Sequence, residues 1–374
     1  MQLDDIYISE TSFRLPKASL RIHLYDSLML KNSQDLGITT KKFKVDNFGK
    51  KSTVAFLDVS SKSKDVKFMP KKSDAKLMRP DVICSTICAQ ELVGQIEPID
   101  RPKEKISFYM SNGFCLDRLS DNINEMSSKY LKPNHAQIGD EDFIVQQNQS
   151  LDRFTPPLFV LNALTNAAQS FSSQYGEFKG DNTTLGGTSQ SSYYALSEAC
   201  QDLKRDTAMA VVGSSNGAGV YSGISNQSRV SNDLFESEGS SFLLLETGLN
   251  IKGRGSNPLA KITAIHDSKL IPSLNSKKQL VVGCDFLLKN KISDTCVFSG
   301  CYSQEDHALV ESKLKQIWSQ TNSTFPVWGN SGVANNFIDI CLAIEIMQKK
   351  NLKTIDCYNR DIFGRESLVS LEAI

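Results

Sequence analysis

An extended run, a glycine bend and a helix follow one another between Gly180 and Leu203, and this segment constrains the fold more than any other. Asn182 to Leu185 is typical of a strand, Gly186 and Gly187 allow a tight bend, and apolar residues then recur at helical spacing. Ser189 is therefore predicted at the N-terminus of a helix. Free N–H groups and partial positive charge at such a terminus suit a nucleophile or an oxyanion. The segment makes Ser189 a candidate site residue.

The same segment resembles the nucleophile segment of β-ketoacyl synthases of the thiolase superfamily, G-P-x-x-x-x-x-T-A-C-x-S-S-x-x-A-L-x-x-A-C. The matching positions are Gly180, Ser191, Ser192, Ala195, Leu196, Ala199 and Cys200. This register places Ser189 where those enzymes carry their cysteine. A shift of one residue would place Gln190 there, but it would break the match at Ala195 and Leu196. We therefore take Ser189 as the counterpart of the nucleophile.

Composition excludes several kinds of partner. With 42 basic and 42 acidic residues the formal charge is zero, so we expect no nucleic-acid or membrane partner, and we interpret the lysine-rich stretch at 41–76 as a solvated surface. Nine cysteines without C-x-x-C pairs and four dispersed histidines predict no metal site, and no motif calls for a cofactor. The acidic start MQLDDIYISE and the lack of a long apolar run predict a cytoplasmic protein.

Alternating strands and helices predict the fold class. The run at 206–213 is nearly continuously apolar, as in a strand that is buried on both faces. The alternation starts again beyond residue 253, with strands predicted at 261–266, 279–284 and 295–299. Two such sets predict a layered α/β protein. The resemblance to the synthases implies a five-layered αβαβα sandwich of two similar halves, which we place at residues 1–250 and 251–374.

Four positions that are chemical in the synthases differ in this chain: the cysteine, which is Ser189 here, two histidines and a lysine. The family's spacing places its first catalytic histidine at Gly300 and its second at Asn330, with Phe325 at the lysine of that motif and Asp339 at its glutamate. A serine hydroxyl is a weaker acid than a thiol and needs an adjacent base, which no neighbour in the sequence supplies. We therefore expect no catalytic residue here. Ser189 and Asn330 are interpreted as polar residues that bond to each other or to water.

Synthase-like chains without the cysteine and the histidines resemble the chain-length-factor, or KSβ, subunits of type II polyketide systems. The resemblance implies a chain that is silent alone, pairs with an active ketosynthase as a heterodimer, shapes the tunnel for the growing chain and meets acyl carrier protein through the complex. It also implies a gate-like role for Phe363, in Ile362-Phe363-Gly364. Aryl-polyene clusters hold short KSβ-like chains, which makes that pathway a further expectation. Most chain-length factors have glutamine at the cysteine position, and Ser189 departs from that pattern.

Two enzyme readings stay open from the sequence. Gly187 to Ser191 is one residue away from the G-x-S-x-G elbow of α/β hydrolases, with His266 or His307 as a base and Asp285 or Asp294 as its orienting acid. The final glycine of that motif is missing, and the preceding strand is polar. The other reading is a serine acyltransferase on the thiolase fold that uses Ser189. His307 is interpreted as a surface histidine at a helix start rather than as a displaced base.

Overall fold

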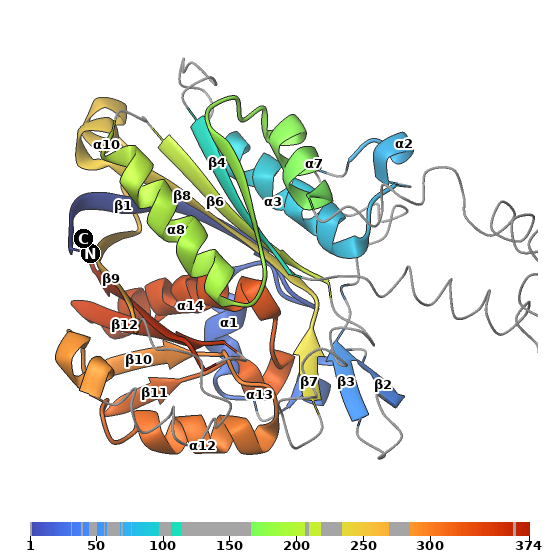
Figure 1. Ribbon diagram of the computed structural model, residues 1–374, viewed down its shortest axis with the longest axis vertical. Coiled ribbons are helices and arrows are strands. Elements are labelled where there is room, and N and C mark those ends of the chain that lie inside the picture. The colour runs from blue at the N-terminus through green and yellow to red at the C-terminus, as the bar shows by residue number, and fades with distance from the viewer. Residues whose placement is uncertain are drawn as a thin grey trace, which may run out of the picture.

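The computed structural model (Figure 1) describes residues 2–30, 32–38, 40–44, 51–55, 57, 68, 70–75, 77–96, 106–113, 166–205, 209–217, 234–268, 285–361 and 364–374. Their strands form a ten-stranded sheet in the order β11-β10-β12-β13-β9-β1-β8-β6-β4-β5 and a three-stranded sheet in the order β2-β3-β7. The strand predicted at 279–284 lies outside these residues.

The first half of the large sheet contains five strands, β1 (Gln2–Arg14), β4 (Ile106–Asn112), β5 (Asn182–Gly186), β6 (Met209–Asn216) and β8 (Gly239–Thr247). Their spatial order is β1-β8-β6-β4-β5. β8 is antiparallel to both β1 and β6, whereas β6, β4 and β5 run parallel. The edge of this half is therefore β5, the strand that leads to Ser189.

The second half repeats this arrangement with β9 (Ala260–Asp267), β10 (Thr295–Phe298), β11 (Gln320–Asn322), β12 (Thr354–Arg360) and β13 (Glu366–Glu372). The order is β9-β13-β12-β10-β11, again with two antiparallel and then two parallel pairings. The first strands of the two halves, β1 and β9, pair antiparallel and join them. Equal strand order and direction confirm the expectation of two similar halves. The division at residues 250 and 251 stays a prediction.

Alternate side chains of each strand point to opposite faces, so each half of the sheet has two faces to cover. Helices cover these faces, and the helices and the two halves of the sheet form five layers. On β6, Met209 and Val211 face α3 (Pro80–Ile96) and α7 (Ala167–Gly176), whereas Ala210 and Val212 face the central layer of α8 (Gln190–Leu203) and α14 (Asn335–Lys350). Beyond the second half of the sheet lie α12 (Gln304–Leu314) and the helical residues 285–290, which pack on apolar side chains of β10 and β12. Figure 1 shows α8 and α14 between the two halves of the sheet. The αβαβα sandwich is confirmed.

The helices of the central layer occupy equivalent places. α8 follows β5 and precedes β6, and α14 follows β11 and precedes β12. Because the strands in each half run parallel here, both helices begin near the carboxyl ends of the strands, where α/β proteins hold their sites. The other elements are α1 (Arg21–Ser27), η1 (Ser33–Leu36), β2 (Thr40–Lys44), β3 (Lys51–Ala55), α2 (Lys72–Ala75), β7 (Leu234–Ser237), α10 (Gly248–Arg254), α13 (Phe325–Trp328) and η3 (Gly332–Ala334).

Helix length and apolarity limit membrane insertion in the part of the chain that the structure describes. There, none of the helices is both long enough and apolar enough to span a bilayer.

Candidate functional site

Ser189 lies at the N-terminus of α8, as the sequence predicts. β5 ends at Gly186, Gly187 has a φ of 151° that favours glycine, and Ser189 is the residue that precedes the helix. Its side chain is buried, with 3% of the residue exposed. Ser189 Oγ donates a long hydrogen bond of 3.5 Å to the carbonyl oxygen of Arg360 and accepts one of 3.3 Å from Asn359 Nδ2. Both partners stand at the end of β12.

The N-terminus of α14 holds the first turn of α8. Asn336 Nδ2 donates to the carbonyl oxygen of Ser189 at 2.9 Å and to Ser192 Oγ at 2.7 Å. Ser192 Oγ in turn donates to the same carbonyl at 2.7 Å. The backbone around Ser189 is therefore fixed by side chains from both halves of the protein.

Gly300 follows β10 and lies against the end of β12. A Cβ atom at this position would stand 2.7 Å from Asn359 Oδ1 and 2.8 Å from the carbonyl oxygen of Arg360. Contacts under about 3 Å with backbone atoms exclude a side chain unless the strand moves. Asn359 thus contacts Ser189 through its amide nitrogen and faces position 300 through its oxygen. The fold therefore brings Ser189 and Gly300, both predicted from the sequence, to the same side chain.

Asn330 lies between α13 and η3 and is bonded within its own turn. Asn330 Oδ1 accepts hydrogen bonds from the backbone N–H of Gly332 and from Asn335 Nδ2, each at 2.7 Å. Its backbone N–H donates to the carbonyl oxygen of Phe235 in β7 at 2.8 Å. Both Ser189 and Asn330 belong to the described residues, and the hydrogen bond that we considered between their side chains is not formed. The side-chain oxygen of each residue accepts hydrogen bonds from other groups instead.

A buried hydroxyl and carboxyl cluster joins the segments that hold Gly300 and Asn330. Ser299 Oγ lies 2.7 Å from Thr324 Oγ1 and donates to Asp339 Oδ1 at 2.5 Å. Burial raises the pKa of Asp339 to about 8, although the hydrogen bonds from Ser299 act in the opposite direction. Asp339, at the position of the family's glutamate, is therefore largely protonated at neutral pH.

Among the described residues, neither His266 nor His307 supplies a base to Ser189. His307 is not a surface residue, because its ring is stacked between Phe298 and Phe325 with centroids 5.2 Å away on each side, and burial lowers its pKa. His266 is opposite Leu368 in the sheet, so it shares the face that carries the outer core, whereas the neighbouring Asp267 accepts hydrogen bonds from α8. His135 and the gate-like Phe363 lie outside the described residues.

The acids of the hydrolase reading are also placed elsewhere. Asp294 has a side chain that is 85% exposed and stands 3.5 Å from Lys291 Nζ, and Asp285 is exposed at the start of the helical residues 285–290. Phe325, at the position of the family's lysine, is fully buried in the outer core. Within the described residues, the hydroxyl of Ser189 thus has an amide and a carbonyl as its partners and no acid–base pair.

Sequence reasoning missed Asn336, Asn359 and Arg360. Arg360 is buried and paired with Asp306; burial would lower the pKa of its guanidinium, but the charge of Asp306 raises it. One signal was available in the sequence, because Asn359 and Arg360 directly follow the strand-like run TIDCY at 354–358. Polar residues at the end of a buried strand are candidates for a site.

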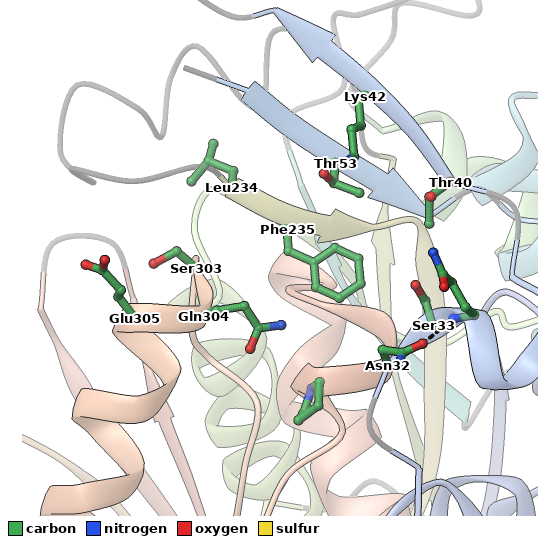
Figure 2. Close-up of a pocket in the computed structure, with 12 residues that line it drawn as sticks. Asn32, Ser33, Thr40, Lys42, Thr53, Leu234, Phe235, Ser303, Gln304 and Glu305 are labelled. Carbon is green, nitrogen blue, oxygen red and sulfur yellow. Dashed lines mark hydrogen bonds between the residues drawn. The ribbon is translucent and has the colours of Figure 1, made fainter. Parts of the chain in front are cut away.

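A groove opens beside this region, between the small sheet and the start of α12 (Figure 2). Its volume is about 620 Å³, and its lining includes Asn32, Ser33, Lys42, Phe235, Ser303 and Gln304. Two lining residues connect the groove to segments already described. Ser303 ends the loop that contains Gly300, and the carbonyl oxygen of Phe235 accepts the hydrogen bond from the backbone N–H of Asn330. The groove therefore borders the segments that hold Gly300 and Asn330.

The chain matches known proteins in structure and not in sequence. No family model matches the chain, and no curated relative is similar to it in sequence. Solved structures match over nearly the whole chain. They include the AntDE:AntF complex, a type II PKS acyl-carrier protein with its ketosynthase bound to the hexaketide, at 14% identity and a TM-score of 0.71 over 100% of both chains. The chain has a thiolase-like ketosynthase fold.

Two further structures have the same fold. A β-ketoacyl synthase from Burkholderia phymatum STM815 is similar at 10% identity and a TM-score of 0.69, with 100% of both chains covered. The ishigamide ketosynthase/chain length factor is similar at 13% identity and a TM-score of 0.70, with 99% of this chain and 100% of that chain covered. At identities this low the likeness concerns the fold, and the chemistry has to be argued from the site itself.

Proposed function

We propose that the chain is a non-catalytic ketosynthase homologue that pairs with an active synthase and shapes the acyl-chain tunnel, as a chain length factor does in type II polyketide or aryl-polyene biosynthesis. In this role it works in the cytoplasm and meets acyl carrier protein through the complex. The named ketosynthase/chain length factor structure has the same fold, which supports the proposal. The observation that carries this proposal is the surroundings of Ser189, whose hydroxyl has an amide and a backbone carbonyl as partners in place of a base.

The surroundings of Ser189 argue against covalent catalysis. Acyl transfer by a hydroxyl needs a base that takes its proton, and a backbone carbonyl such as that of Arg360 is not basic enough to do so. The amide of Asn359 donates to the same oxygen and occupies a lone pair that would attack. Decarboxylative condensation additionally needs the two imidazoles that Gly300 and Asn330 replace.

The packing around Gly300 makes it hard to restore a histidine at this position. The atoms of Asn359 and Arg360 stand where a side chain at 300 would begin. The same contacts pack the end of β12 against the loop after β10, so the space of the former histidine now contributes to the packing of the second half. A fold that is kept without its chemistry is expected where the surface still serves a partner.

The test is co-expression with candidate synthases that retain the cysteine and both histidines. We expect a stoichiometric complex on purification, condensation of malonyl and acyl carrier-protein thioesters by the complex, and none by this chain alone. A Ser189→Ala variant should support the complex as well as the original chain does. Condensation by the isolated chain, or acyl-Ser189 in its mass spectrum during turnover, would contradict the proposal.

A further inference from the structure

Charged side chains are buried on the outer face of the second half, where β12 ends and β13 begins. Arg360 of β12 is directly opposite Glu366 of β13, and Tyr358 lies two residues before Arg360 on the same face. The exposed fraction is 6% for Arg360 and 2% each for Glu366 and Tyr358. A buried charge is costly unless it is paired, so the partners of Arg360 and Glu366 decide how this end of the sheet is held.

Arg360 is paired with the start of α12. Its Nη2 donates to Asp306 Oδ1, and Asp306 Oδ2 accepts a hydrogen bond of 3.0 Å from the backbone N–H of Tyr302. The backbone N–H of Asp306 in turn donates to Ser303 Oγ at 3.1 Å, which caps α12. Asp306 therefore joins the end of β12 to the first turn of α12 and to the loop that contains Gly300.

Glu366 and Arg360 each have hydrogen-bonding capacity that these contacts leave unused. Glu366 Oε1 accepts a hydrogen bond of 2.7 Å from the hydroxyl of Tyr358. Among the described residues, Glu366 Oε2 and Arg360 Nε are buried without a hydrogen-bond partner. Directly opposite residues of an antiparallel pair have Cβ atoms about 4.5–5.5 Å apart, so the two side chains can reach each other. An ionised Glu366 would offer the acceptor that Arg360 Nε lacks.

The charge on Glu366 changes near neutral pH. Burial raises the pKa of its carboxyl to about 7, although the hydrogen bond from Tyr358 and the charges of Arg360 and Lys313 act in the opposite direction. A neutral carboxyl attracts a guanidinium weakly, whereas a carboxylate forms a charge-assisted hydrogen bond that is about twice as strong. Glu366 therefore needs a cationic partner only when it is ionised.

The other titratable groups around Glu366 do not change charge with it. Burial raises the pKa of Tyr358 and of the Cys301 thiol, so both are neutral. Burial lowers the pKa of His266, which lies on the same face of β9, so its ring is neutral before Glu366 ionises. The charged groups of α12 that act on Arg360 and Glu366 include Asp306 and Lys313.

We propose that Asp306 and Glu366 compete for the guanidinium of Arg360, and that ionisation of Glu366 moves Arg360 from α12 to β13. Burial sets the direction, because water cannot solvate an ionised Glu366, whereas the side chain of Asp306 is 16% exposed and can turn to solvent. Loss of the ion pair loosens the first turn of α12, which carries Gln304 and Glu305 at the groove of Figure 2. The ion pair is thus a pH-dependent latch on one wall of the groove.

The side-chain Nε–Hε signal of Arg360 in the isotope-labelled full chain reports which carboxylate it contacts. We expect this signal to move between pH 6 and pH 8.5 with a midpoint near pH 7. It should keep its pH 6 position in Glu366→Gln, which retains an acceptor for Tyr358 and cannot ionise. Amide hydrogen exchange in the first turn of α12, corrected for the intrinsic effect of pH, should become about tenfold faster over the same range, the effect of one lost charge-assisted hydrogen bond.

Three more variants complete the experiment, and thermal melting checks that each is folded. Asp306→Asn should exchange fast in this turn at both pH values, because the ion pair is already lost. Glu311→Gln, at another carboxylate of α12, and His266→Gln, at the neighbouring imidazole, should follow the original chain.

An Arg360 signal that is unchanged by pH, or that moves equally in Glu366→Gln, would overturn the proposal. So would exchange in the first turn of α12 that depends on pH in the same way in both proteins. None of these measurements involves a synthase, so failure of the chain to pair would refute the proposed function and leave the latch intact.

Discussion

Asp339 makes the stability of the protein depend on pH in a direction that can be calculated. Only 1% of the residue is exposed, and burial raises the pKa from its ordinary value of 3.8 to about 8. Between these two values the folded protein holds a proton that the unfolded chain releases. The free energy of unfolding therefore falls as pH rises through this window, and the stabilisation is complete only below the unfolded value.

The size of the effect follows from the same shift. A shift of about four units at 1.36 kcal/mol per unit corresponds to roughly 5 kcal/mol as an upper limit, or a slope of about 1.4 kcal/mol per pH unit. This is comparable to the whole stability of many domains, about 5–15 kcal/mol. Asp339→Asn keeps an oxygen acceptor for Ser299 and cannot ionise, so it should remove this slope. We expect the variant to be the more stable protein at pH 9, and the difference between the two proteins to shrink steadily towards pH 5, where about 1.6 kcal/mol remains.

Urea unfolding followed by circular dichroism, at one-unit steps from pH 5 to pH 9, measures the slope. Burial also raises the pKa of Glu366 to about 7, so both proteins lose some stability over this range, and the difference between them isolates Asp339. Asp294→Asn, at an exposed carboxylate, controls for the loss of a charge as such. Parallel curves for Asp339→Asn and the original protein would refute the reasoning.

Three further predictions follow from the packing at the site. Gly300→Ala should destabilise the protein by about 1–3 kcal/mol in urea unfolding, because its Cβ would overlap the end of β12, whereas Gly253→Ala, where no atom lies within 4 Å, should be neutral or slightly stabilising. Asn336→Ala should cost about 1–3 kcal/mol in the same assay, since it leaves buried acceptors of α8 without their donor. Ser189→Cys combined with Asn330→His should give no condensation of malonyl thioesters, because position 300 still lacks its base; measurable turnover would show that the first histidine is dispensable.

The amino-acid sequence by itself determines the layers and the place of Ser189. Apolar residues alternate faces along β6 and β8, helical spacing follows the glycine bend, and the same pattern returns in the second half. These signals are local, because period and turn chemistry act over a few neighbouring residues. A layered α/β protein and the start of α8 at residue 190 could therefore be predicted from these signals, whereas the αβαβα arrangement was implied by the resemblance to the synthases.

Contacts between distant segments were decided only by the tertiary structure. The sequence places His307 near a helix start, which is correct, but its burial depends on Phe298 and Phe325 meeting on either side of the ring. In the same way, the side chain of Asn359 fills the space beside Gly300, and the high pKa of Asp339 arises from its complete enclosure. Burial and steric exclusion are properties of packing among residues far apart in the chain, and for that reason no local pattern encodes them.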